Sequence, residues 1–370
     1  MRIHTLFLLC VLGAAVAGAW ASEVSFFGSP SRGMAGAGIA LMRDPTSQMY
    51  LNPAAVAYVR GFRFGVNNFN LNTENITARQ LQDTLEIGQK GAVDINDAAR
   101  IIRTFGDEEK VRAVLSADIG FVASGVAVTF GGVGDFRLYP NENLRRWVRG
   151  DTDDLSGARG DLYGVFVFSL PEVAVGTRLS ISDERSDELA LGVRARFLRV
   201  FYTHYFAQEN DIAGGQDSSR YRAPELGNQD YLDERGVAID FGVIYKPNRD
   251  IPLSYALVVE NLIEPKVEFA YTPPGGGALS SIKPIKRAVH LGIAMEDQRG
   301  LTYVVDWVDV TNNTERSELR FGAEQRIGRG LAVRAGYGSR NGWAVGAEIF
   351  GINLAVAQKF PLQVSRSITF

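Results

Sequence analysis

The sequence predicts an all-β protein, a transmembrane antiparallel β-barrel of about 14 strands with an N-terminal hatch and a short helical insert. Three observations favour this class. From about residue 286 onward, apolar and polar residues alternate with the two-residue period of a strand. The polar face of these segments carries charge or glycine almost throughout. The chain also begins with a segment typical of exported proteins.

Residues 319–327 show the alternation. Leu319 and Phe321 lie on one face of the predicted strand, and Arg320 and Glu324 lie on the other. The next two segments repeat this pattern between glycine-containing turns, so consecutive hairpins are predicted. A soluble sheet with one solvated face would give the same alternation, so this pattern alone leaves both architectures open.

A membrane barrel places the apolar face against lipid and the charged face in its lumen. Under this interpretation the lumenal charges should pair with one another. We assign six residues to such a lumenal network: Asp240, Arg320, Glu324, Arg326, Arg334 and Glu348.

The first 21 residues decide between the two architectures. Residues 1–21 combine Arg2, an apolar run too short to span a bilayer and a terminal Ala-Trp-Ala sequence, which together are typical of a secretory signal peptide. The single cysteine, Cys10, would be removed with this segment. No later segment approaches the roughly 18 apolar residues of a membrane helix, so we expect export and insertion as a barrel.

Composition and charge agree with this class. Hydrophobic residues make up 46% of the chain and its mean hydropathy is -0.04, which is too polar for a helical membrane protein. The formal net charge of -3 argues against a nucleic-acid partner.

Residues 22–60 do not alternate and are predicted to fold as a compact hatch inside the barrel. Small residues dominate this segment, and they allow close backbone packing. Pro45 and Pro53 suit the first turns of two short helices that Asp44 and Asn52 would cap. Three glycines in the segment lack the spacing of a dinucleotide or Walker loop.

The run Arg-Gly-Met-Ala-Gly-Ala-Gly at 32–38, followed by an acid-Pro pair and by Tyr-x-Asn-Pro-Ala at 50–54, resembles the hatch of FadL-type outer-membrane β-barrels. That superfamily also holds PorV-like secretion proteins and a TraF-like group associated with conjugal transfer. Residues 237–265 and 306–324 are similar to paired hairpins of the PorV-like and TraF-like branch. The predicted hatch residues are Arg32, Gly33, Gly36, Gly38, Asn52, Pro53 and Ala54.

Residues 61–370 are assigned to the barrel. We expect a first strand from Gly61 to Asn70 and an extracellular insert at 71–114, in which apolar residues recur at helical spacing. Residues 160–181 contain Pro171 and are taken as one crossing, because this places every long insert on one side and gives an even strand number.

The C-terminal strand resembles the signal read by the barrel-assembly machinery. Phe370 and Ile368 carry this resemblance, and Arg366 departs from the alternating pattern. We therefore expect the assembly machinery and outer-membrane lipid as partners.

Catalysis, cofactors and metals have little support in the sequence. After signal cleavage, His204 and His290 are the only histidines, and neither lies in a catalytic or zinc-binding motif. A Ser-His hydrolase that uses His290 and calcium sites at the acidic clusters near 151–154 and 183–187 remain alternatives.

The resemblance implies an outer-membrane protein that is not an enzyme. Its implied function is passive transport of hydrophobic small molecules, with a ligand moving through the lumen when the hatch shifts. The alternative is a non-enzymatic envelope scaffold in protein secretion or conjugation.

Overall fold

The structure is a computed structural model, and it describes most of the chain. The described residues are 31, 33–42, 49–74, 104–105, 111–182, 187–208, 232–247, 252–271, 280–297, 299–314, 317–328, 330–340, 342–358 and 360–369. The predicted signal peptide, Arg32 and Phe370 lie outside these residues. In the described part of the chain, no helix is long and apolar enough to cross a membrane.

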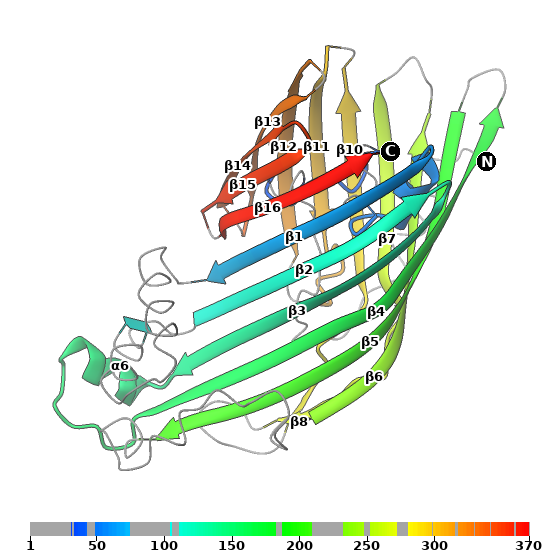
Figure 1. Ribbon diagram of the computed structural model, residues 1–370. Coiled ribbons are helices and arrows are strands. Elements are labelled where there is room, and N and C mark those ends of the chain that lie inside the picture. The colour runs from blue at the N-terminus through cyan, green and yellow to red at the C-terminus, as the bar shows by residue number, and fades with distance from the viewer. Residues whose placement is uncertain are drawn as a thin grey trace.

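Fourteen antiparallel strands form a closed barrel (Figure 1), which confirms the predicted fold class. The ring closes because β1 pairs with β2 on one side and with β16 on the other. The strands are β1 (Phe62–Glu74), β2 (Val111–Ala123), β3 (Val126–Pro140), β4 (Arg159–Ser182), β5 (Asp187–Gln208), β6 (Leu232–Lys246), β7 (Leu253–Ile263), β10 (Ala288–Glu296), β11 (Leu301–Val308), β12 (Glu318–Ile327), β13 (Leu331–Gly338), β14 (Gly342–Ile349), β15 (Ile352–Ala357) and β16 (Phe360–Thr369).

Four smaller elements, two helices and two short strands, lie outside the barrel sheet. The 3-10 helix η1 (Pro53–Tyr58) precedes β1, and the helix α6 (Glu142–Arg149) lies between β3 and β4. The strands β8 (Phe269–Tyr271) and β9 (Ser280–Ile282) form a separate two-stranded sheet between β7 and β10. We call the barrel end with these long connections the loop end, and the opposite end the turn end.

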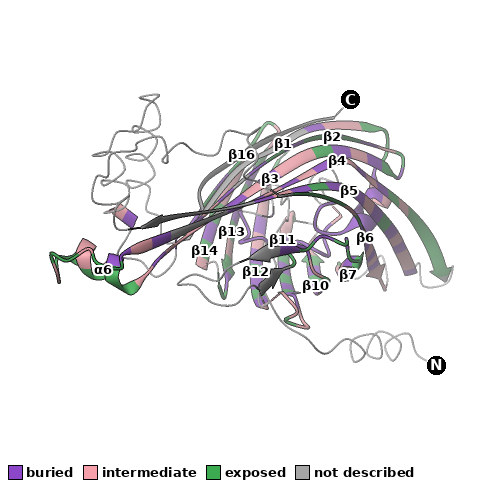
Figure 2. Cartoon of the chain, turned by 90° about the horizontal axis from the view of Figure 1, so that it is seen from below, coloured by how far each residue is buried: buried purple, intermediate pink, exposed green. Residues whose placement is uncertain are grey.

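The barrel is apolar outside and charged inside. On β12, Leu319 and Phe321 are 44% and 47% exposed, whereas the alternating Arg320 and Glu324 are 3% and 5% exposed. Figure 2 shows the same alternation of buried and more exposed residues along many strands. The predicted assignment of the two faces is therefore correct.

Residues 160–181 run once from one end of the barrel wall to the other, as predicted, within the 24-residue strand β4. The register of β4 shifts between Ser169 and Glu172 relative to both neighbouring strands. Pro171 lies within this irregularity, where a residue without an N–H can be accommodated.

The predicted bounds of the insert, 71–114, are wrong at both ends, because they include residues of the two flanking strands. Strand β1 continues to Glu74, β2 begins at Val111, and Glu74 pairs with Arg112. Backbone hydrogen bonds hold this pairing, so it does not end where the apolar alternation ends. Within the insert, residues 104–105 are helical, and the other predicted helical residues lie outside the described part.

Helix α6 was not predicted, although its ends carry recognisable signals. The side chain of Asn141 accepts a hydrogen bond from the backbone N–H of Leu144 and caps the first turn. Gly150 follows the helix with a φ of 80°, a left-handed conformation that favours glycine.

Candidate functional site

The described part of the predicted hatch lies inside the barrel, against a smooth strip of the inner wall. Gly176, Gly192 and Gly242 are register partners across β4, β5 and β6. A Cβ built on Gly192 would lie 2.3 Å from the backbone nitrogen of Ala54. Because these positions have no side chain, the backbone at the start of η1 rests directly on the wall.

A second set of glycines receives the earlier part of the hatch. Cβ atoms built on Gly322 and Gly336 would lie 2.7 Å and 2.3 Å from atoms of Met34. A Cβ on Gly346 would lie 2.8 Å from the Cα of Gly33. Of the predicted hatch glycines, Gly33 therefore contacts β14 directly.

Polar side chains of the strands bind the hatch backbone between these glycines. Asp306 Oδ2 accepts hydrogen bonds from the N–H groups of Gly38 and Ile39 at 2.6 Å and 3.0 Å. Arg320 Nη1 donates to the carbonyl oxygen of Gly36 at 3.3 Å, and Ser254 Oγ lies 2.9 Å from the carbonyl oxygen of Ala40. These contacts come from β11, β12 and β7, so the hatch is held from several directions.

Asn52 joins two parts of the hatch to each other and to the wall. Its Oδ1 accepts from the N–H of Ala54 at 2.9 Å, which caps η1 at the predicted position. Its Nδ2 donates to the carbonyl oxygens of Ile39 and Val243 at 3.1 Å and 3.2 Å. Pro53 follows at the first position of the helix, where no backbone N–H is needed.

A first charged cluster lies beneath η1 on β4, β5 and β6. Arg194 Nε contacts Asp240 Oδ2 at 2.7 Å, and Arg194 Nη1 contacts Glu172 Oε1 at 3.2 Å. Arg196 contacts the second oxygen of Asp240 at 3.0 Å. Arg194 also donates to the carbonyl oxygen of Tyr50 at 3.2 Å, so this cluster holds the hatch as well.

A second charged cluster joins β12, β13, β14 and β15. Arg334 contacts Glu324 at 2.6 Å and Glu348 at 2.7 Å, and it donates to Asn353 Oδ1 at 2.9 Å. Arg326 contacts the other oxygen of Glu324 at 2.9 Å. Four of the six predicted network residues therefore meet here, whereas Asp240 lies in the first cluster. The sixth, Arg320, pairs with Glu318 at 2.7 Å beside the hatch.

Tyr50 is a hatch residue that the sequence interpretation did not select. Its hydroxyl donates to Asp118 Oδ2 on β2 at 2.6 Å, and both residues are buried. Burial raises the pKa of Tyr50, and the nearby carboxylates of Asp118 and Glu172 raise it further. The inward position of Asp118 in an alternating strand was the available signal, but nothing in the sequence links it to Tyr50.

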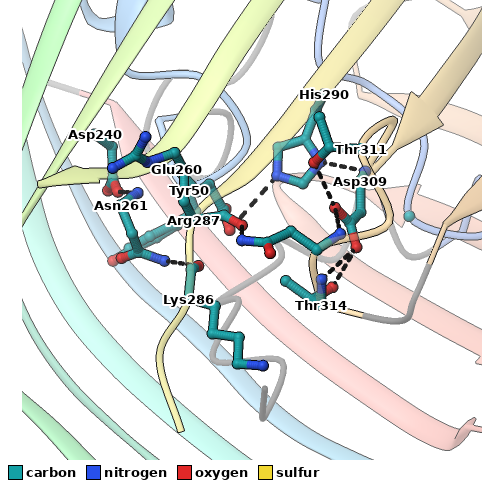
Figure 3. Close-up of polar contacts among 12 residues, drawn as sticks. Tyr50, Asp240, Glu260, Asn261, Lys286, Arg287, His290, Asp309, Thr311 and Thr314 are labelled. Carbon is teal, nitrogen blue, oxygen red and sulfur yellow. Dashed lines mark hydrogen bonds and ion pairs between the residues drawn. The ribbon is translucent and has the colours of Figure 1, made fainter. Parts of the chain in front are cut away.

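His290 takes part in positioning the connection after β11 (Figure 3). Its Nδ1 accepts from the backbone N–H of Asp309 at 3.0 Å, and its Nε2 lies 3.6 Å from Glu260 Oε2. Asp309 in turn accepts from the N–H and the hydroxyl of Thr314 at 2.9 Å and 2.6 Å. Among the described residues, no group of three or more His, Cys, Asp or Glu is arranged to hold a metal.

Toward the loop end, the inner wall of β4, β5 and β6 becomes apolar. Its buried inward residues are Val165, Val167, Leu198, Val200, Tyr202 and Ala238. Residues from the connection between β7 and β10 cover them, and Phe269 stacks on Tyr202 with 5.3 Å between ring centroids. The barrel interior therefore has an apolar region next to the charged cluster around Asp240.

No protein-family model matches the chain, and no curated protein matches it in sequence. Solved structures with the same fold include two hydrocarbon channels. A CymD monoaromatic hydrocarbon channel has a TM-score of 0.52 and 13% identity, and the match covers 95% of this chain and 99% of that chain. A TodX deltaS2S3 mutant monoaromatic hydrocarbon channel has a TM-score of 0.50 and 12% identity, with 93% and 98% covered. At these identities the similarity shows the fold, a closed antiparallel barrel.

Proposed function

We propose that this protein is a FadL-type channel of the bacterial outer membrane that passes small hydrophobic molecules without an energy source. The observation that carries the proposal is the apolar inner wall of β4, β5 and β6, because a water-filled pore has a polar lining. The fold shared with two hydrocarbon channels supports the same function.

The exterior supports the membrane location. Apolar side chains cover the outward positions of strand after strand, including Phe197, Phe321 and Val345, which are 47% to 49% exposed. A water-soluble barrel would bury such residues, since monomeric soluble proteins rarely expose large contiguous apolar surfaces. Lipid is the environment that covers them at low free energy.

The interior suggests a route and an obstacle. A hydrophobic ligand would displace the residues of the β7–β10 connection that cover the apolar wall around Val167 and Val200. The charged cluster at Arg194 and Asp240 would then stop its further movement. The hatch rests on that cluster through Tyr50. Transport therefore requires the hatch to shift locally, while the ion pairs keep the barrel wall intact.

An uptake assay tests this function. Cells that express the protein and matched deletion cells are given a labelled neutral monoaromatic hydrocarbon, and uptake is followed over time. We expect faster uptake with the protein and loss of that difference in Val200→Glu, which places a charge on the apolar wall. Val200→Leu is the control, and heat-modifiable gel mobility verifies that both barrels fold. Equal uptake with and without the protein contradicts transport.

A second candidate function, a non-enzymatic scaffold for secretion or conjugation, is favoured by one observation. The hatch is held by buried hydrogen bonds from four strands, β5, β7, β11 and β12, as expected for a static body. Purification in mild detergent tests it: the scaffold function predicts that defined envelope proteins copurify, whereas isolation of the barrel alone contradicts it.

A further inference from the structure

The barrel wall has very different heights on its two sides. Strands β4 and β5 contain 24 and 22 residues, whereas β13 and β14 contain 8 residues each and β15 contains 6. Figure 1 shows β3 to β6 reaching far beyond the loop-end edges of β13 to β15. We call the wall formed by β13, β14 and β15 the low wall.

The connections at both edges of the low wall limit the thickness of hydrocarbon that can surround it. At the loop end, Arg340 and Gln358 are exposed in turns, and at the turn end Phe350 and Gly351 form the turn between β14 and β15. Irregular backbone and charged side chains do not occur within the hydrocarbon in contact with lipid. The hydrocarbon beside the low wall must therefore fit between these turns.

The lengths of the strands give the membrane depth that the low wall can cover. At about 3.4 Å per residue, β14 is about 27 Å long and β15 about 20 Å long. With the usual strand tilt of about 35–45°, they cover about 21 Å and about 15 Å of membrane depth, against an apolar band of about 25 Å on outer-membrane barrels. The low wall is therefore shorter than the membrane it would have to cross.

The side chains of the low wall suit lipid rather than a protein partner. Its outward residues are apolar, including Val345 on β14 and Leu354 and Val356 on β15, which are 39% to 49% exposed. Near the loop-end edge, Tyr337 pairs in register with Trp343, and both are about half exposed. Exposed Tyr and Trp are typical of the level of lipid headgroups, which places that level close to the edge of the low wall.

We propose that the low wall thins the bilayer locally, so that the outer leaflet dips toward the barrel along β13, β14 and β15. This inference rests on the membrane location proposed above and does not depend on transport. A short hydrophobic surface is accommodated by thinning of the bilayer, and the free-energy penalty increases with the mismatch. The protein should therefore be most stable in bilayers with short acyl chains.

Reconstitution into bilayers of different thickness tests the inference. The purified protein is placed in vesicles of dilauroyl, dimyristoyl or dioleoyl phosphatidylcholine, and thermal unfolding is followed above the lipid melting temperatures. We expect the highest midpoint temperature of unfolding in the lipid with the shortest acyl chains that still forms stable vesicles. In a lengthened variant, two residues are added to the loop end of each of the strands β13, β14, β15 and β16. Adding residues in pairs preserves the inward and outward faces. The optimum of this variant should shift toward longer chains.

A matched insertion and a depth measurement complete the test. Four residues inserted near Asp153, in the connection between β3 and β4, should leave the chain-length optimum unchanged. In the protein without residues 1–21, with Trp147 and Trp307 replaced by phenylalanine, Trp343 is the single tryptophan. In dioleoyl vesicles it should be quenched more by lipids brominated near the headgroup than by lipids brominated near the chain end.

Three outcomes overturn the inference. The first is a midpoint temperature of unfolding that is equal in all three lipids or highest in the dioleoyl lipid. The second is a crosslink between the β14 strands of two copies that forms equally in thin and thick bilayers. A second copy of the protein, and not lipid, would then cover the low wall. The third is failure to enter any vesicle, which also overturns the membrane location, whereas loss of hydrocarbon uptake alone affects only the transport function.

Discussion

Asp306 on β11 accepts a hydrogen bond from the backbone N–H of Gly38 at 2.6 Å, across 268 positions of sequence. The same oxygen accepts from Ile39 at 3.0 Å, and Asp306 is fully buried. One carboxylate thus satisfies two consecutive backbone N–H groups of the hatch. Inside a barrel these groups have no strand partner, so the wall must supply their acceptor.

Asp306→Ala should loosen the hatch without opening the barrel. Each buried N–H that loses its acceptor costs about 1–3 kcal/mol, so residues 33–42 should exchange their amide hydrogens faster by one or more orders of magnitude. Hydrogen-deuterium exchange with mass spectrometry in detergent measures this directly. Asp297→Ala, in the turn after β10, is the control and should leave hatch exchange unchanged. Unchanged exchange in Asp306→Ala would show that other contacts suffice to hold the segment.

The barrel could be predicted from the sequence because lipid and lumen impose opposite polarity on alternate residues. Phe321 and Arg320 are adjacent in sequence and face opposite environments, so their order alone indicates the two faces. The charged partners could not be predicted in the same way. Arg334 meets residues of three other strands, and their relative register depends on turns that the polarity pattern does not define.

The contacts of the hatch were least accessible to sequence analysis. In the sequence, nothing distinguishes Gly192 from other glycines in strands. Its role is evident only in the structure, where Pro53 and Ala54 lie on it. The resemblance of residues 50–54 to a hatch motif identified the segment, and the helix cap at Asn52 followed from general rules. The part of the wall that receives this helix depends on the path of the whole chain and has no local signal.

Gly192→Ala should displace η1 from the wall. The added Cβ would lie 2.3 Å from the backbone nitrogen of Ala54 and 2.4 Å from the carbonyl oxygen of Pro53, so one of the two segments must move. We expect a loss of about 1–3 kcal/mol in the free energy of unfolding, as for other overpacked sites. Urea unfolding in detergent micelles measures it.

Gly160→Ala provides the matched control for this change. A Cβ at Gly160 would meet Leu144 at 3.5 Å, which is ordinary van der Waals contact. Its stability should therefore change by less than about 0.5 kcal/mol, as at most uncrowded sites. Equal losses in the two variants would show that η1 does not depend on close contact with the wall.

Arg334→Ala should destabilise the barrel more than simultaneous replacement of Arg334, Glu324 and Glu348 by uncharged residues. The single substitution leaves the buried carboxylate of Glu324 and the partly buried one of Glu348 without their shared partner. Breaking a buried pair in this way costs about 3–5 kcal/mol, whereas neutral replacements of all partners are often tolerated. The comparison is with the triple variant Arg334→Met, Glu324→Gln, Glu348→Gln in urea unfolding. A single variant that is more stable than the triple variant contradicts this account.

The buried hydroxyl of Tyr50 should make the hatch sensitive to alkaline pH. Burial and the carboxylate of Asp118 raise the pKa of Tyr50 in the folded state above its unfolded value of about 10. The unfolded chain therefore loses this proton first as the pH rises. The contribution of Tyr50 to stability is fully present below about pH 10 and is lost as the pH increases toward the folded pKa.

Tyr50→Phe isolates this effect, because phenylalanine keeps the ring but cannot ionise. The difference in unfolding free energy between the wild type and Tyr50→Phe should be constant from about pH 7 to about pH 9 and should then fall by about 1.4 kcal/mol per pH unit. Urea unfolding at each pH measures it, and taking the difference cancels the titration of the other tyrosines. A difference that stays flat through alkaline pH would mean that Tyr50 ionises as easily in the folded protein as in the unfolded chain.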